Sequence, residues 1–197
     1  MKTWPLIGFL WLIAGHPASA KAESPSFPPI HQILTENKDA VVTEFRQWRR
    51  DMIAAIRKTI EERVREDHWR HEGSKTHLAI VWAGELRATE LTPLLIRHIE
   101  FRIWNKEFLP REDLYPAVRA LILIGKSSSA ACLAALGNEQ ETIRRKNLLL
   151  VIRRVEGEEA TMRLVRKSVE EETDENRKAN LRAALGLFST KRSSTRP

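Results

Sequence analysis

Three histidines, His68, His71 and His77, are the residues of this chain best suited to chemistry, and they lie in the stretch DHWRHEGSKTH. His68 and His71 are three positions apart, so on a helix both imidazoles share a face and could bind one zinc ion. With a third protein ligand, the ion would keep an open position for the activated water of a metal-dependent hydrolase. The sequence shows no partners for the second imidazole nitrogens, which zinc sites need. Histidines near the end of a helix also interact favourably with its last carbonyls.

The remaining motifs argue against catalysis. Gly125-Lys126-Ser127 matches only the end of a phosphate-binding loop, because no strand precedes it and the earlier glycine is missing. Neither a nucleophile elbow nor a pair of carboxylates stands out. Cys132 is the only cysteine, which excludes an intrachain disulfide and favours a core side chain over an intermolecular disulfide. We therefore expect a chain without catalytic residues, cofactor or metal, with the three histidines as the alternative.

Residues 1–20, MKTWPLIGFLWLIAGHPASA, have the three parts of a secretory signal peptide. A basic start at Lys2 precedes an apolar run from Leu6 to Ala14, and Ala18-Ser19-Ala20 predicts cleavage after Ala20. That run is too short to cross the roughly 30 Å hydrocarbon core of a membrane, although an uncleaved anchor is the alternative. We expect an exported chain, periplasmic or secreted, with no transmembrane span after cleavage and with a linker at 21–36.

The charge of the exported chain is only mildly basic. Cleavage would remove one basic residue, Lys2, from a sequence with 33 Lys and Arg against 26 Asp and Glu. Three further basic residues lie in the tail 189–197, which has no apolar side chain to fix it and is expected to be disordered. Nucleic acid is therefore not the partner we expect, and an acidic protein fits the charge better.

A long amphipathic helix is predicted from Asn37 to about Arg65, within a segment that extends to residue 73. Its apolar residues recur every three or four positions and form one stripe. The stripe is expected to cap the first end of the repeats that follow, and a dimer seam or a membrane-surface helix are the alternatives. Its members are Val41, Phe45, Trp48, Met52, Ile56, Ile60 and Val64.

Residues 74–188 read as helical hairpins. In the first, Ser74 caps a helix with an apolar face that includes Leu78 and Trp82, and a second helix runs from the Leu91 region to about Trp104. A loop at 105–113 leads to a central hairpin, 115–136, whose second helix follows Ser129. The third hairpin combines 142–155 with 160–172 around Gly157, and a last helix covers 175–188. Trp69, Trp82 and Trp104 are expected to pack in the core or at hairpin ends.

The hairpins resemble the HEAT-repeat family. WAGELRATELTPLLIRHI matches the HEAT signature at Gly84, Leu91, Pro93 and Leu95, although Ala83 and Thr92 replace its usual Leu and Val. AVRALILIGKSSSAACLAAL is similar to a variant with a short Ile-Gly-Lys turn, but lacks the expected proline. The resemblance implies an all-α, short right-handed α-α solenoid of HEAT-like hairpins, led by the long N-terminal helix. Members of the family are mostly scaffolds.

The resemblance also implies a binding surface, because the second helices of HEAT hairpins line the concave side. Ordinary solvated faces, balanced by glutamates such as Glu100 and Glu170, are the alternative. We expect an exported, non-catalytic scaffold that binds a protein partner, with a polyanion-binding module or a metal-dependent hydrolase as alternatives. Its expected partner-binding residues are Arg97, His98, Arg102, Arg163, Arg166 and Lys167.

Overall fold

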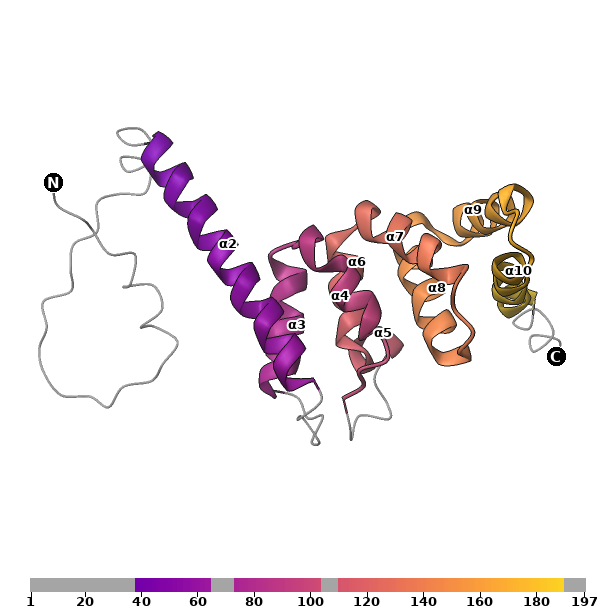
Figure 1. The fold of residues 1–197 in the computed structure, drawn as a ribbon, viewed down its shortest axis with the longest axis horizontal. Coiled ribbons are helices and arrows are strands. Elements are labelled where there is room, and N and C mark those ends of the chain that lie inside the picture. Colours follow the sequence, from indigo (N-terminus) through magenta and orange to yellow (C-terminus); the bar gives the residue numbers. More distant parts are fainter. Residues whose placement is uncertain (1–37, 65–72, 104–109, 190–197) are drawn as a thin grey trace, which may run out of the picture. The chain divides into compact units, whose positions relative to one another are not determined.

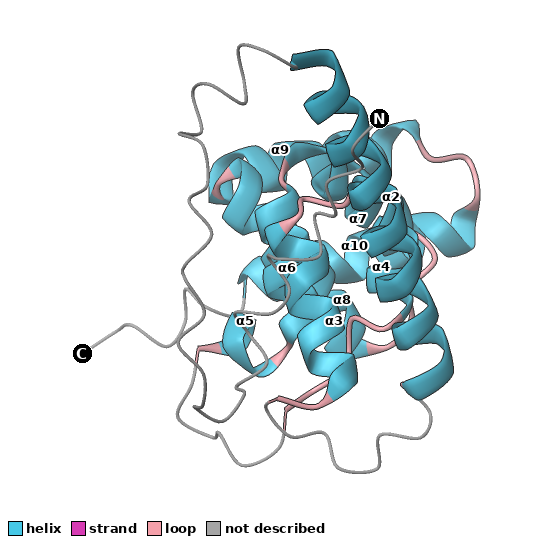
Figure 2. Cartoon of the chain, turned by 90° about the vertical axis from the view of Figure 1, so that its left-hand side faces the viewer, coloured by secondary structure: helices cyan, strands magenta, loops and turns pink. Residues whose placement is uncertain are grey.

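The computed structural model of the chain describes residues 38–64, 73–103 and 110–189, and these are all-helical, without a strand (Figures 1 and 2). The all-α class is therefore confirmed. By its contacts the chain divides after Glu44 into two units, and only the start of α2 (Lys38–Arg63) is described in the first. Within the described ranges, no helix has the length and apolar character needed to cross a membrane.

The second unit continues from α2 through a series of shorter helices. Strong packing joins α3 to α6, α6 to α8, α7 to α8, and α9 to both α8 and α10. Fully buried Leu121, Leu136, Leu148 and Ile152 lie at the centre of the core. In chain order the elements after α2 are α3 (Lys75–Glu85), the 3-10 helix η2 (Thr89–Leu91), α4 (Thr92–Arg97), α5 (Arg111–Leu114), α6 (Pro116–Ile124), α7 (Lys126–Leu136), α8 (Thr142–Glu156), α9 (Glu158–Glu171) and α10 (Glu175–Ser189).

Helix α4 is much shorter than predicted, because the chain leaves the helix after Arg97. Residues 98–100 form a turn, closed by the N–H of Phe101, which donates to the carbonyl of His98 at 2.9 Å. Ile99, Phe101 and Ile103 are buried, while the residues between them are exposed. The N–H of Ile103 donates to the carbonyl of Leu114, 3.0 Å away, and so ties this segment to α5. The expected helix to Trp104 was therefore wrong, and the expected loop at 105–113 contains the start of α5.

Helix α3 buries Ile80 together with its small residues and exposes two of its large apolar ones. Leu78 and Trp82 are 46% and 44% exposed, whereas the face with Ala83 and Gly84 is buried against α6. A Cβ at Gly84 would lie 2.7 Å from the Cα of Ala120, so the two helices touch backbone to backbone at this point. The predicted core position of Trp82 was therefore wrong. Trp69 and Trp104 lie outside the described residues.

Two helix junctions share one turn geometry. Gly125 separates α6 from α7 with φ of 89°, and Gly157 separates α8 from α9 with φ of 87°, values that favour glycine. The hydroxyls of Ser128 and Thr161 each donate to the carbonyl of the preceding glycine, at 2.7 Å in both cases. The turn at Gly157 is confirmed. In the central hairpin the turn is Gly125 alone, and α7 begins at Lys126 rather than after Ser129.

Only part of the apolar stripe of α2 packs in the core. Ile56 and Ile60 are buried as expected, together with Ile53, which the predicted stripe did not include. Phe45 is 56% exposed and stacks in a tilted geometry on Trp48, with ring centroids 5.6 Å apart. The stripe is therefore confirmed as a core contact only over its second half.

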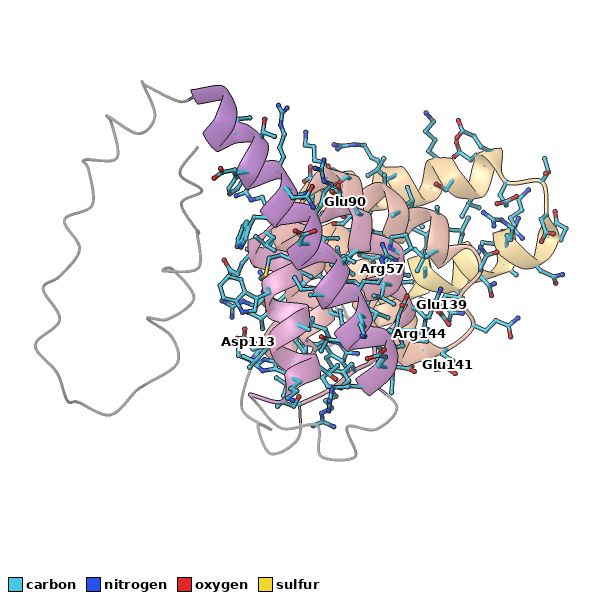
Figure 3. All side chains as sticks on the ribbon, turned by 60° about the vertical axis from the view of Figure 1, so that its left-hand side comes forward. Arg57, Glu90, Asp113, Glu139, Glu141 and Arg144 are labelled. Atoms are coloured by element: carbon cyan, nitrogen blue, oxygen red, sulfur yellow. The ribbon has the colours of Figure 1, made fainter. Side chains whose placement is uncertain are left out.

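Arginines on α2 join it to η2 through Glu90. Arg49 Nη1 lies 2.6 Å from Glu90 Oε1, and Arg57 Nη2 donates to the Glu90 carbonyl at 2.9 Å (Figure 3). The hydrogen bond from Arg49 lowers the pKa of Glu90 below its ordinary value. The contact therefore includes a charge that is present at neutral pH and lost in acid.

Candidate cationic cleft between α5, α8 and α10

The candidate metal ligands are only partly described. His68 and His71 lie outside the described residues. His77 helps to start α3, since its N–H donates to Ser74 Oγ at 3.2 Å and its Nδ1 accepts the N–H of Gly73 at 2.9 Å. Within the described parts of the chain, no three His, Cys, Asp or Glu side chains are placed to hold a metal ion. The Ser74 cap is confirmed, and the metal site stays an untested alternative.

The six predicted partner-binding residues fall into two groups on different helices. Arg97 ends α4, and His98 and Arg102 follow it, whereas Arg163, Arg166 and Lys167 lie on α9. Helix α4 packs mainly against α6 and α7, and α9 against α8 and α10. Arg163 and Lys167 form long ion pairs with Glu159 and Glu171, at 4.0 and 3.6 Å, that are well exposed to solvent.

A cleft of about 610 Å³ opens between α5, α8 and the end of α10. Its volume falls within the range of ligand-binding pockets, roughly 300–1,000 Å³. None of the six predicted residues lines it. Its walls combine cationic and apolar side chains, namely Arg111, Glu112, Lys146, Leu149, Leu150, Arg153, Arg154, Leu187 and Phe188.

One face of α8 supplies the floor of the cleft. Lys146, Leu149, Leu150, Arg153 and Arg154 recur at intervals of three and four, so their side chains lie along a single stripe. Leu149 is almost completely buried, and Leu187 and Phe188 of α10 are partly buried against the same core. The cleft therefore has an apolar centre with basic residues one turn away on either side.

The two basic residues at one end of α8 already have carboxylate partners. Arg154 forms an ion pair with Glu112 of α5, and Arg153 Nε lies 3.5 Å from Glu158. Each pair places a carboxylate close to a guanidinium, so their charges largely cancel. This end of the cleft is polar but nearly neutral.

Arg111 and Lys146, at the other end, have no carboxylate partner among the residues that the structure describes. Arg111 Nε donates to Asn147 Oδ1 at 2.7 Å, and its guanidinium lies 5.0 Å from the ring centroid of Tyr115. Its Nη2 is buried and has no hydrogen-bond partner in the described part of the chain. Since neither Arg111 nor Lys146 has a carboxylate partner among the described residues, this end of the cleft has a net positive charge that favours an anion.

Asn147 fixes the position of Arg111. It is fully buried, and while its Oδ1 accepts from Arg111, its Nδ2 donates to the carbonyl of Ile99 at 2.9 Å. One amide thus links α8 to α5 and to the turn after α4. The guanidinium is held in place before any ligand arrives, which reduces the entropy lost on binding.

The basic residues at the start of α8 have a different, structural role. Arg144 Nε lies 2.7 Å from Glu139 Oε2, and its Nη1 donates to the carbonyl of Arg97 at 3.0 Å (Figure 3). Burial lowers the pKa of Arg144, but Glu139, Glu100 and Glu141 outweigh it and raise the pKa above its ordinary value. Arg144 is therefore a neutralised link between α8 and the end of α4.

The cleft was not predicted from the sequence, because the partner-binding surface was expected on the second helices of the hairpins. α8 is a first helix, and Arg111 lies in a stretch that was expected to be a loop. A signal was present in RRKNLLLVIRRVEG, where basic residues flank an apolar run on both sides and recur at helical spacing. The partner wall from α5 could not be inferred from that pattern.

Comparisons of the chain with protein-family models, with curated proteins and with solved structures find no match. No relative therefore assigns a role to a residue of the cleft. Its function is inferred from the side chains that line it and from the charges of Arg111 and Lys146, which have no carboxylate partner in the described ranges.

Proposed function

We propose that the chain is an exported, non-catalytic binding module that holds an acidic segment of a protein partner in the cleft between α5, α8 and α10. One observation carries the proposal: Arg111 and Lys146 lack carboxylate partners among the described residues and lie beside an apolar floor. Burial of apolar side chains supplies affinity and the two cations supply direction and specificity.

A protein segment fits this cleft better than a long polyanion. Nucleic acids and sulfated glycans bind through many cations in a row, and their affinity comes mainly from displaced counter-ions. Here Arg153 and Arg154 are already paired, which leaves two cationic groups and four apolar side chains. Acidic peptides with apolar residues match that composition.

The proposal includes a HEAT-like, right-handed solenoid as the scaffold. Three features support it: Pro93 lies in the first turn of α4, Gly84 lies at the close contact of α3 with α6, and two hairpins share the glycine turn. Packing between helices close in the chain is also what an α-solenoid requires. Export is supported by residues 1–20, and N-terminal sequencing of the exported protein should find Lys21 first.

The test is peptide selection with matched charge variants. Phage-displayed random 12-residue peptides are selected on the exported chain, on Lys146→Glu and on Arg166→Glu. Lys146 lines the cleft and Arg166 is an exposed arginine of α9, so the two variants change the net charge equally at different surfaces. We expect peptides rich in Asp or Glu with Leu or Phe, bound by the parent and Arg166→Glu but lost in Lys146→Glu.

Three outcomes would move the function elsewhere. Loss of the selected peptides in Arg166→Glu but not in Lys146→Glu would place binding on the α9 surface predicted from the sequence. If no peptide is enriched and heparin binds with a steep dependence on salt, the polyanion alternative holds. Stoichiometric zinc in the purified chain, lost on His71→Ala, would support the hydrolase alternative.

A further inference from the structure

We infer that the occupant of the cleft is the C-terminus of a polypeptide, with its terminal carboxylate at Arg111 and Lys146 and an apolar last side chain over Leu149 and Leu150. The inference rests on the proposed function, and it names the part of the partner that the cleft recognises. The juxtaposition that carries it has three parts along α8: a cationic end without carboxylate partners in the described ranges, an apolar centre and a neutralised end.

The order of charges along α8 gives the cleft a direction. From Lys146 to Arg153 the helix rises about 10 Å, at about 1.5 Å per residue, which is the length of roughly three extended residues. Within the cleft, the net positive charge lies at the Lys146 end, because Arg153 and Arg154 are paired with glutamates. A ligand with one anionic group, followed at once by an apolar group, matches this order; a uniformly acidic chain does not.

The back of the cationic end is filled. Behind Arg111 lies Asn147, which has no exposed surface and is hydrogen-bonded to the guanidinium and to the carbonyl of Ile99. Among the described residues, Asn147 therefore closes one side of the space at Arg111. A terminal carboxylate ends there, whereas an internal Asp or Glu would require the backbone to pass on both sides.

The neutralised end favours a polypeptide over a fatty acid, which also combines a carboxylate with an apolar group. Glu112, Arg153 and Arg154 line this part of the cleft, and Arg154 is 55% exposed. Backbone N–H and C=O groups of a peptide can hydrogen-bond to such side chains. An alkyl chain would instead remove water from two ion pairs and offer no hydrogen bonds in place of that water.

The experiment measures binding of fluorescein-labelled peptides to the full exported chain by anisotropy. The first peptide is Gly-Ser-Gly-Ser-Gly-Ser-Leu-Phe with a free C-terminal carboxylate, and the second is the same peptide as a C-terminal amide. The third carries an internal glutamate, in Gly-Ser-Gly-Glu-Leu-Phe-Gly-Ser as an amide. Dodecanoate is added as a competitor of the first peptide.

We expect the free acid to bind about 10- to 100-fold more tightly than the amide, the range that a charge-assisted hydrogen bond supplies. Lys146→Gln should reduce that ratio, as should Arg111→Lys, which keeps the charge but loses the planar guanidinium. Arg166→Gln should leave the ratio unchanged. Because Lys146 is exposed, its substitution leaves the core intact, and a circular dichroism spectrum checks this.

Three results would overturn the inference. The first is that the amide, or the peptide with an internal glutamate, binds as tightly as the free acid. This result would exclude a terminal carboxylate but leave the proposed peptide binding in place. Displacement by dodecanoate at lower concentrations than by unlabelled peptide would assign the cleft to an alkyl carboxylate. If all three peptides fail to bind and selection enriches none, the proposed function fails together with the inference.

Discussion

Substitution of Gly84 by alanine tests the closest helix contact of the fold. The new Cβ would lie 2.7 Å from Ala120 Cα, 3.1 Å from Ala120 Cβ and 3.2 Å from Leu123 Cδ1. Non-bonded carbons rest at about 3.5–4.0 Å, so α3 and α6 must separate by roughly 0.8 Å or more. Since the nearest atom belongs to the backbone of α6, no change of rotamer can relieve the contact.

The expected cost follows from two opposing effects. Overpacking of a tight core destabilises by about 1–3 kcal/mol, and this contact lies at the upper end of that range. The higher helix propensity of alanine offsets about 1 kcal/mol of this destabilisation. We therefore expect Gly84→Ala to lower the free energy of unfolding by about 2 kcal/mol.

Gly186 provides the matched control, because it also lies inside a helix, α10, yet a Cβ there would meet nothing within 4 Å. Gly186→Ala should raise the free energy of unfolding by about 1 kcal/mol, through the higher helix propensity of alanine alone. The two variants should therefore differ by about 3 kcal/mol, or about 6–12 °C in Tm for a domain of this size. Urea titrations followed by circular dichroism at 222 nm give both values. A Gly84→Ala variant as stable as Gly186→Ala would refute the backbone contact between α3 and α6.

Three further predictions concern turns, charge and burial. Gly125→Ala and Gly157→Ala should each lower the free energy of unfolding by about 1–2 kcal/mol in urea titrations. Both sites have open space, but a φ near 88° is unfavourable for alanine. A neutral effect would contradict the shared turn. Glu90 has a folded-state pKa below its unfolded value of about 4.3, so its contribution to stability is complete above that pH and is lost as the pH falls through the folded pKa. Glu90→Gln should therefore reduce the difference in unfolding free energy between pH 7 and pH 3, by less than about 1 kcal/mol because the pair is exposed; an unchanged difference would count against the Arg49 contact. Burial raises the pKa of Cys132 to about 12, so iodoacetamide at pH 8 should label this thiol in urea but not in the folded chain, and rapid labelling of the folded chain would contradict its burial.

Local signals in the sequence were sufficient for much of the helical framework. Ser74 predicted the start of α3, and Gly157 predicted the junction of α8 with α9, because caps and left-handed turns depend on a few neighbouring residues. The ends of α8 were expected within one residue. The periodicity of α2 predicted a long helix, and the structure agrees within two residues at each end.

Features that depend on distant partners were missed. Leu78 and Trp82 look like core residues by size, but the buried face of α3 is set by how closely α6 approaches Gly84. The alternate burial from Ile99 to Ile103, which follows the turn at the end of α4, is too short to stand out beside a helical pattern. Arg111 and Asn147 are 36 positions apart, so nothing local in the sequence indicates that they meet.

The mode of attachment of α2 has a consequence for how the chain opens below its global unfolding transition. Three isoleucines and the Glu90 contacts connect the described part of α2 to its neighbours, whereas α7 and α8 share an extensive fully buried interface. Backbone amides of α2 should therefore exchange with deuterium through partial opening, faster at high salt because the arginine contacts are screened. The amides of α7 and α8 should exchange only when the whole unit unfolds. The chain thus has two levels of stability, and screening of the Glu90 contacts lowers the first of them.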